Sequence, residues 1–142
     1  MTYSFSDITL VVSHPSFGQY TAMGEGLGTI DISMANDNSQ HDISADGRVV
    51  TTKIKAANGN VAITMQQTSS FNKWLTKLYN YLKTAKSSEW AKATITVRAP
   101  QLNETTVCTG ISFQKPGDKS YQAQSQMKTW NLIAEDIQHN AV

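Results

Sequence analysis

The sequence has little cysteine, little charge and no long hydrophobic run, and each absence excludes a class of protein. The single cysteine, Cys108, excludes an internal disulfide and suits a reducing compartment. No apolar run approaches the roughly 20 residues that span a bilayer. The first residues, MTYSFSDITLVV, lack the basic and apolar regions of a signal peptide. We therefore expect neither a membrane anchor nor a signal peptide.

Recognisable catalytic chemistry is also missing. The histidines, His14, His41 and His139, do not stand at metal-ligand spacing from one another. Cys108 falls inside an alternating pattern with no histidine placed by the sequence to activate it, so we interpret it as a packed side chain. Acidic residues are scattered singly, which does not favour a paired-carboxylate hydrolase. We predict no catalytic, cofactor-binding or metal-binding residue, and no enzyme activity.

Charge is both balanced and sparse. Twelve basic and 11 acidic residues give a formal net charge of +1, which argues against a dedicated nucleic-acid binder. Charged residues make up 16% of the chain, against roughly 25% in an average domain. Because charged residues are depleted at the cores of protein interfaces, this composition suggests that much of the surface is buried by self-assembly.

Hydrophobic periodicity predicts the elements of a single domain, residues 1–142. Segment 69–83 has helical spacing and predicts one helix lying across a sheet, capped by Ser69 or Ser70. The apolar face of this helix consists of Phe71, Trp74, Leu75, Leu78 and Leu82. Alternating strands are predicted at residues 7–13, 28–35, 93–99 and 105–113, with one or two more between 121 and 137.

The clearest local signal is Asn58-Gly59, inside GRVVTTKIKAANGNVAITMQQ at residues 47–67. Two alternating runs around Asn-Gly predict a hairpin, because a type I′ turn needs positive φ at both central residues. The predicted register pairs Ile54 with Ile63. One face of this hairpin is then apolar, and the other carries threonine, lysine and glutamine.

Together these patterns predict a mainly β fold, α+β by strict count. It is an antiparallel β-sandwich or barrel of about seven strands with one flanking helix. Residues 36–47 show no pattern of their own. A loop of this length is uncommon unless it is functional or mobile.

Four segments carry a pattern that extends from near the first residue to about Ile137. They are YSFSDITLVV, GTIDISMANDNSQHDISADGRVV, NVAITMQQTSSFNKWL and CTGISFQKPGDKSYQAQSQMKTWNL. This pattern resembles the tail tube protein family of contractile-tailed bacteriophages, whose tubes are related to those of R-type bacteriocins and type VI secretion systems. The resemblance implies a β-sandwich that forms hexameric rings, with strands joined into a continuous inner barrel. Stacked rings would form a hollow tube inside a contractile sheath.

The same resemblance implies partners and a location. The chain would be made in the host cytoplasm and become part of the virion tail. Its partners would be copies of itself, the tail sheath, the baseplate hub and the tape measure protein. DNA would pass through the tube by transient, sequence-independent contact, and no cofactor is expected.

Two sets of residues are candidate sites under this interpretation. The candidate lumen-facing residues, on the polar face of the predicted hairpin, are Thr51, Lys53, Lys55, Thr64 and Gln66. The candidate inter-subunit or inter-ring loop residues are Asn36, Asp37, Asn38, Gln40, His41, Asp42 and Asp46. The lysines fit a DNA channel poorly, because such a channel is expected to repel phosphate. Either Asp31 and other acids offset them, or that face points elsewhere.

Two alternatives stay open. One is a monomeric β-barrel module that binds an apolar ligand or a glycan, with Trp74, Trp130 and Tyr121 as aromatic contacts. The other is a tail terminator or tube initiator, which shares the tube fold but assembles once and does not polymerise.

Overall fold

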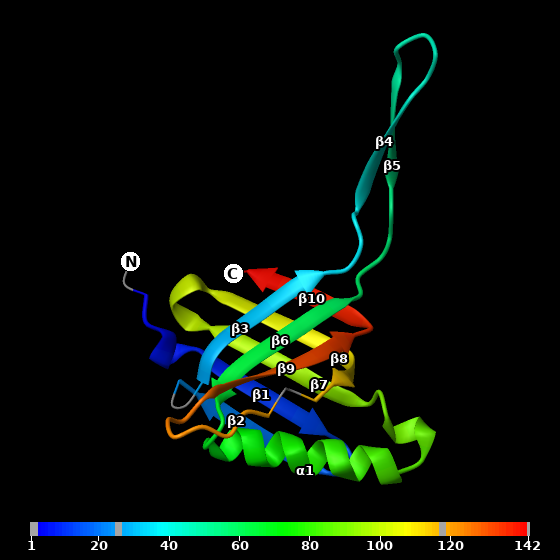
Figure 1. The fold of residues 1–142 in the computed structure, drawn as a ribbon. Helices are drawn as coiled ribbons and strands as arrows, with labels where there is room; N and C mark the ends of the chain where they lie inside the picture. Colours follow the sequence, from blue (N-terminus) through cyan, green and yellow to red (C-terminus); the bar gives the residue numbers. More distant parts are fainter. Residues whose placement is uncertain (1–2, 25–26, 117–118, 142) are drawn as a thin grey trace.

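The structure is a computed structural model that describes residues 3–24, 27–116 and 119–141 (Figure 1). Within these ranges the strands are β1 (Thr9–His14), β2 (Gly18–Met23), β3 (Leu27–Met34), β4 (Ser39–Ile43), β5 (Val49–Lys53), β6 (Gly59–Gln66), β7 (Ala93–Ala99), β8 (Glu104–Lys115), β9 (Met127–Ala134) and β10 (Asp136–Ala141). The α-helix is α1 (Ser70–Thr84), and the short 3₁₀ helices are η1 (Phe5–Asp7), η2 (Ser87–Glu89) and η3 (Pro100–Leu102).

Eight strands form one folded sheet in the order β2-β1-β7-β8-β9-β6-β3, with β10 also paired to β8. The first part of β8 pairs with β7 and β10, and its last residues pair with β9. We call β2-β1-β7-β8-β10 sheet A and β8-β9-β6-β3 sheet B. All the described pairs are antiparallel. In Figure 1, β3, β6 and β9 cross in front of β1 and β7.

The chain passes from sheet A to sheet B at a bend in β8. Gly110 has φ 65, and the N–H of Glu135 donates to the carbonyls of Thr109 at 3.0 Å and Gly110 at 3.3 Å. A Cβ on Gly110 would lie 2.6 Å from Oε2 of Glu135, so the conformation and the contact both require glycine. Glu135 also separates β9 from β10, so β8 and the neighbouring strands bend together.

Side chains of both sheets alternate into one core. Along β6, Val61, Ile63 and Met65 are buried, whereas the residues between them are partly or fully exposed. Trp130 of β9 lies opposite Ile63 and is 1% exposed. Its ring packs edge-on against Phe113 of β8 at 5.5 Å between centroids. Sheet A contributes Leu10, Val12, Ala93, Ile95 and Cys108 to this core.

Helix α1 closes the end of the sandwich (Figure 1). Ser69 caps it, as predicted, by accepting a hydrogen bond from the N–H of Asn72 at 3.2 Å. The side chain of Asn72 is also buried, and its Oδ1 accepts from the indole N–H of Trp130 at 3.0 Å. This bond ties the helix to β9. The predicted apolar residues Phe71, Leu75, Leu78 and Leu82 are buried.

The predicted fold class is confirmed: the chain is mostly antiparallel β with one flanking helix. Strands are more numerous than the seven expected, with ten in the described residues. The extra strands arise partly because the C-terminal segment is divided at Glu135. They also arise because residues 18–23 and 39–43 form strands without a clear apolar alternation.

The predicted hairpin around Asn58-Gly59 is wrong. β6 pairs with β3 and β9 rather than with residues 49–56. Positive φ occurs at neither Asn58 nor Gly59 among the described residues, so they do not form a type I′ turn. Glycine is needed here for another reason, because a Cβ on Gly59 would lie 2.3 Å from the carbonyl oxygen of Ser33 on β3. Pairing of β6 with β3 and β9 therefore outcompetes the local turn signal.

The predicted loop at residues 36–47 is also wrong in part. β4 within it pairs with β5, and Ser39 lies opposite Lys53 and Ile43 opposite Val49. We call residues 39–53, which comprise β4, β5 and the turn between them, the arm. The arm projects away from the sandwich at the end opposite α1 (Figure 1).

Candidate assembly surfaces

The arm is a two-stranded ribbon with no core beneath it. Every residue of β4 and β5 is exposed, and within the described ranges the two strands pair with each other alone. Ile43, Val49 and Val50 are 75%, 55% and 57% exposed. An isolated two-stranded hairpin is marginally stable in water, and clustered exposed aliphatic side chains mark interaction surfaces. The arm thus has the properties of a segment that another chain covers.

The turn at the end of the arm is held by its own polar groups. The N–H of Ser44 donates to the carbonyl of Arg48 at 2.9 Å, and Gly47, with φ 86, completes the turn. The carboxylate of Asp46 accepts from the hydroxyl of Ser44 and from the N–H of Arg48. It also lies 3.3 Å from Nε of Arg48. The hydrogen bonds from Ser44 and Arg48, in that order, lower the pKa of Asp46.

The outer face of sheet B is polar and nearly uncharged. The strand register places there the side chains that alternate with the core. They are Thr29, Asp31 and Ser33 of β3, Asn60, Ala62, Thr64 and Gln66 of β6, and Met127, Thr129, Asn131 and Ile133 of β9. Thr64 and Thr129 lie opposite each other, with 2.9 Å between their hydroxyl oxygens. This surface offers mainly hydroxyl and amide groups, with one carboxylate, Asp31, and one amine, Lys115 of β8 opposite Asn131.

Sheet B has two edges without a described partner. On one side β3 pairs with β6 alone within the described residues. On the other side, β7 pairs with β8 only as far as Ile111, so residues 112–115 of β8 are paired with β9 alone in the described structure. Unpaired strand edges are templates for pairing with another chain.

The predicted lumen residues fall on two different parts of the molecule. Thr51 and Lys53 lie on β5 in the arm, and Lys55 lies in the link between β5 and β6. Thr64 and Gln66 lie on the outer face of β6. The residues opposite them on β9 were absent from the prediction, although the alternation over residues 127–134 carried the signal.

The predicted loop residues all belong to the arm or its base. Asn36, Asp37 and Asn38 lie between β3 and β4, Gln40, His41 and Asp42 lie on β4, and Asp46 lies in the turn. The side-chain N–H of Asn36 donates to Oδ1 of Asn58 at 2.8 Å, and two backbone bonds, Ala35 N–H to the Asn58 carbonyl at 3.0 Å and Ile54 N–H to the Asn38 carbonyl at 2.9 Å, also join the two sides of the base.

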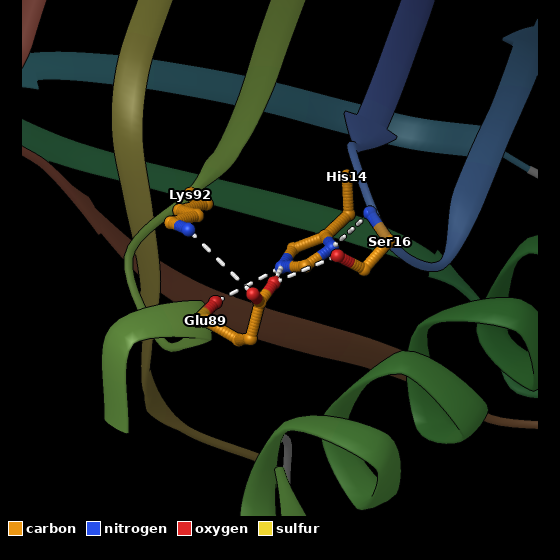
Figure 2. Close-up of polar contacts among 4 residues, drawn as sticks. All are labelled: His14, Ser16, Glu89 and Lys92. Atoms are coloured by element: carbon orange, nitrogen blue, oxygen red, sulfur yellow. Dashed lines mark hydrogen bonds and ion pairs between the residues drawn. The ribbon is translucent and has the colours of Figure 1, made fainter. Parts of the chain in front are cut away.

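A polar cluster around the buried side chain of His14 joins the β1–β2 turn to η2 (Figure 2). Nδ1 of His14 accepts from the N–H of Ser16 at 3.1 Å, so the neutral ring carries its proton on Nε2 and donates to the carbonyl of Glu89 at 2.9 Å. The Ser16 hydroxyl donates to Oε2 of Glu89 at 2.9 Å and is the main cause of the lowered pKa of Glu89. Lys92 lies 3.5 Å from Oε1.

This cluster has a structural role, because it holds the β1–β2 turn against η2. Both ring nitrogens of His14 are engaged by backbone groups, so neither is available to activate Ser16 as a nucleophile. Sequence reasoning missed it because His14 and Glu89 are 75 residues apart.

Groups of three or more His, Cys, Asp or Glu placed to hold a metal ion are absent from the part of the chain that the structure describes. No described helix is both long and apolar enough to cross a membrane.

The aromatic residues of the binding-module alternative have different neighbours. Trp130 is in the core, and Trp74 packs against Phe17 at 5.5 Å between ring centroids. Tyr121 is 83% exposed. The larger hollows described are a groove of about 540 Å³ beside the start of α1 and one of about 700 Å³ at the base of the arm. None of the three residues lines either hollow.

Comparison with solved structures identifies the fold as one found in contractile injection systems. A chain of the anti-feeding prophage baseplate, determined by cryo-EM with 6-fold symmetry, is similar with a TM-score of 0.69 and 10% identity, covering 100% of this chain and 97% of that chain. A chain of the PVC sheath-tube complex, an extracellular contractile injection system in its extended state, gives a TM-score of 0.62 and 12% identity, covering 99% and 93%. A chain of the anti-feeding prophage tube terminating cap gives a TM-score of 0.61 and 8% identity, covering 100% of this chain and 93% of that chain.

The sequence model of one family, described as the bacteriophage PhiTE tail tube protein, matches residues 1–141. The chain belongs to this tail tube family. It is therefore a structural component of a phage tail and not an enzyme. No curated protein sequence matches it.

Proposed function

We propose that this chain is the repeating subunit of a tail tube, in which sheet B of each copy joins sheet B of its neighbours to close a hollow barrel. The observation that carries the proposal is sheet B itself: four strands, one nearly uncharged outer face and two edges without a described partner. Closing such a sheet through a ring removes the exposed edges.

Strand direction favours this closure. In the order β8-β9-β6-β3 each neighbour is antiparallel, so β8 and β3 run in opposite directions. Rotation about a ring axis preserves the direction of each strand along that axis. The β3 edge of one copy would therefore meet the β8 edge of the next copy in antiparallel orientation, which continues the pattern of the whole sheet. The ring would be hexameric, as the family resemblance implies.

The bore would then be lined by the outer face of sheet B. Thr64 and Gln66 remain candidate lumen residues and are joined by Thr129 and Asn131. Thr51, Lys53 and Lys55 are better assigned to the arm and the link beside it, which removes the conflict between their positive charge and the passage of DNA. A surface that offers mainly hydroxyl and amide groups, with Asp31 and Lys115 as one acid and one base, would let DNA pass without tight phosphate contacts.

The arm would contact an adjacent subunit or ring, which would cover its exposed aliphatic residues. The assembled tube would lie inside the sheath, between the baseplate hub and the rest of the tail. Its length would be set with the tape measure protein, and its subunits would be made in the host cytoplasm. Sheath contraction would drive the tube into the host envelope, and DNA would follow through the bore.

A tube terminator or initiator is the second candidate, because the tube terminating cap of the anti-feeding prophage has the same fold. The two candidates differ in polymerisation. A tube subunit forms many stacked rings by itself, whereas a terminator forms one ring. Electron microscopy of the concentrated purified protein distinguishes them, and a strictly monomeric species under all conditions would contradict both.

Cysteine cross-linking tests the proposed seam. Lys115 lies on the outer face of β8, so Lys115→Cys would be combined separately with Thr29→Cys, Asp31→Cys or Ser33→Cys to sample three registers. One combination should give a ladder of covalent oligomers on a non-reducing gel, ending at the ring number. Thr96→Cys with Lys115→Cys is the matched control. Native Cys108 should not form cross-links, because burial raises its pKa to about 11.

A further inference from the structure

The region around α1 carries a strong local excess of positive charge. Residues 73–92 contain five lysines and one acidic residue, Glu89, which leaves seven basic and ten acidic residues for the rest of the sequence. The lysines are Lys73, Lys77, Lys83, Lys86 and Lys92, and all are exposed. A chain with almost balanced charge therefore has an uneven charge distribution.

These lysines are not neutralised by described neighbours. The ion pairs that lysine and arginine form in the described residues join Lys92 to Glu89 and Arg48 to Asp46. The remaining four lysines have no carboxylate within 4.0 Å in the part of the chain that the structure describes. Lys73 and Lys77 lie opposite the buried face of α1, so their charges point away from the sandwich. We call Lys73, Lys77, Lys83 and Lys86 the lysine face.

The opposite end of the molecule is the end that bears the arm. β6 begins at Gly59, next to the base of the arm, and ends at Gln66, just before α1 (Figure 1). Ala134 lies opposite Gly59, which brings the Glu135-Asp136 pair to the same end. The arm and its flanking links add three acids, Asp37, Asp42 and Asp46, and three bases, Arg48, Lys53 and Lys55, so that with Glu135 and Asp136 the five acids exceed the three bases by two. We call this end the arm pole.

We propose that the lysine face of one copy receives the arm pole of a second copy, so that complementary charge sets the direction of stacking. This inference rests on the proposed function, because an open stack needs two different surfaces at opposite ends of the subunit. Electrostatic complementarity fixes the register and suppresses the reversed contact, in which two lysine faces would meet. At roughly 3.4 Å per residue, the five-residue arm strands extend about 17 Å beyond their base. They would cross the boundary between the two copies.

Charge reversal on the lysine face tests the inference. The variant Lys73→Glu/Lys77→Glu should still form rings but stack poorly. The protein concentration needed for tubes should rise by about tenfold or more, since the altered pairs recur in every subunit of a ring. Lys77→Glu alone should have a smaller effect. Arg98→Glu, an equal reversal on the outer face of β7, should leave tube formation unchanged. Circular dichroism and thermal melting confirm that each variant folds.

Second-site reversal identifies the partner surface. Adding Asp37→Lys or Asp42→Lys to Lys77→Glu should restore stacking, and failure of both would overturn the arm pole as the partner. If Lys73→Glu/Lys77→Glu formed tubes as readily as wild type, the inference would also be overturned. The lysine face would then be assigned to contact with a different, acidic chain. Loss of rings from folded protein would overturn it too, by assigning the lysines to the seam. If wild-type protein formed no tubes, the proposed function itself would fail.

Discussion

The arm and the sandwich are both antiparallel β structure, yet they differ in what holds them together. In the sandwich, alternate side chains of β6 and β9 are buried against a shared core. In the arm, every strand residue is exposed. Backbone pairing is the same in both, but the hydrophobic contribution is absent from the arm. We therefore expect the sandwich to fold as an isolated subunit, whereas we expect the arm to be stabilised by a neighbouring chain.

The largest expected contrast is between Trp130→Ala and Ile43→Ala. Trp130→Ala should reduce the free energy of unfolding by about 3–5 kcal/mol, because it leaves a cavity and removes the hydrogen-bond donor to Oδ1 of Asn72. Ile43→Ala should change the free energy of unfolding of the isolated subunit by less than about 0.5 kcal/mol, because Ile43 is an exposed surface residue. Urea denaturation measures both. A large loss from Ile43→Ala in dispersed protein would show that the arm is part of the cooperative fold.

A second contrast compares Gly59→Ala with Gly47→Ala. The new Cβ at Gly59 would meet the backbone of β3, and we expect about 1–3 kcal/mol of destabilisation. Gly47 has φ 86, but a Cβ added there would meet no other atom within 4 Å. Its substitution should strain the arm turn while leaving the unfolding midpoint of the sandwich unchanged. Equal shifts of the midpoint for both variants would contradict the separation of the two regions.

Local signals in the sequence predict part of the fold correctly, and Gly59 is an example of a local signal that does not. The helix over 70–84 was predictable because its 3.6-residue period and its Ser69 cap are local. The pairing of β6 was not, since Asn58-Gly59 is a strong local turn signal whose glycine instead allows β3 to approach closely. The arm was missed because β4 has no alternation to detect, and the alternating run that contains β5 was assigned to a hairpin around Asn58-Gly59 instead of to a pair with β4. The edges of sheet B depend on contacts between strands far apart in the chain.

A third contrast compares the two polar clusters. His14→Leu should cost about 1–3 kcal/mol, because it removes the partner of the Glu89 carbonyl and of the Ser16 N–H. Asp46→Ala should loosen the arm turn and raise hydrogen exchange at residues 44–48 with no shift in global unfolding. Thermal melting together with hydrogen exchange checks both. A melting shift for Asp46→Ala comparable with that for His14→Leu would contradict the comparison.

The smallest effect concerns pH. The pKa of Glu89 is lowered from 4.5 in the folded state, mainly by the Ser16 hydroxyl. The unfolded state therefore binds a proton first as the pH falls, so this stabilisation is present above pH 4.5 and is lost below it. Wild type and Glu89→Gln should converge in stability as the pH falls below that value. Ser16→Ala should reduce the difference in stability that Glu89→Gln causes. A difference between wild type and Glu89→Gln that widens as the pH falls would contradict the predicted direction.

In the proposed tube, sheet B is the wall of a bore that copies of the chain close. Cryo-EM of tubes assembled from purified protein tests this most directly. We expect Thr64 and Thr129 to face the bore, β3 of one subunit to pair with β8 of the next, and the arm to be ordered against a neighbour. A bore lined by α1, or rings whose β3 edges stay open, would contradict it.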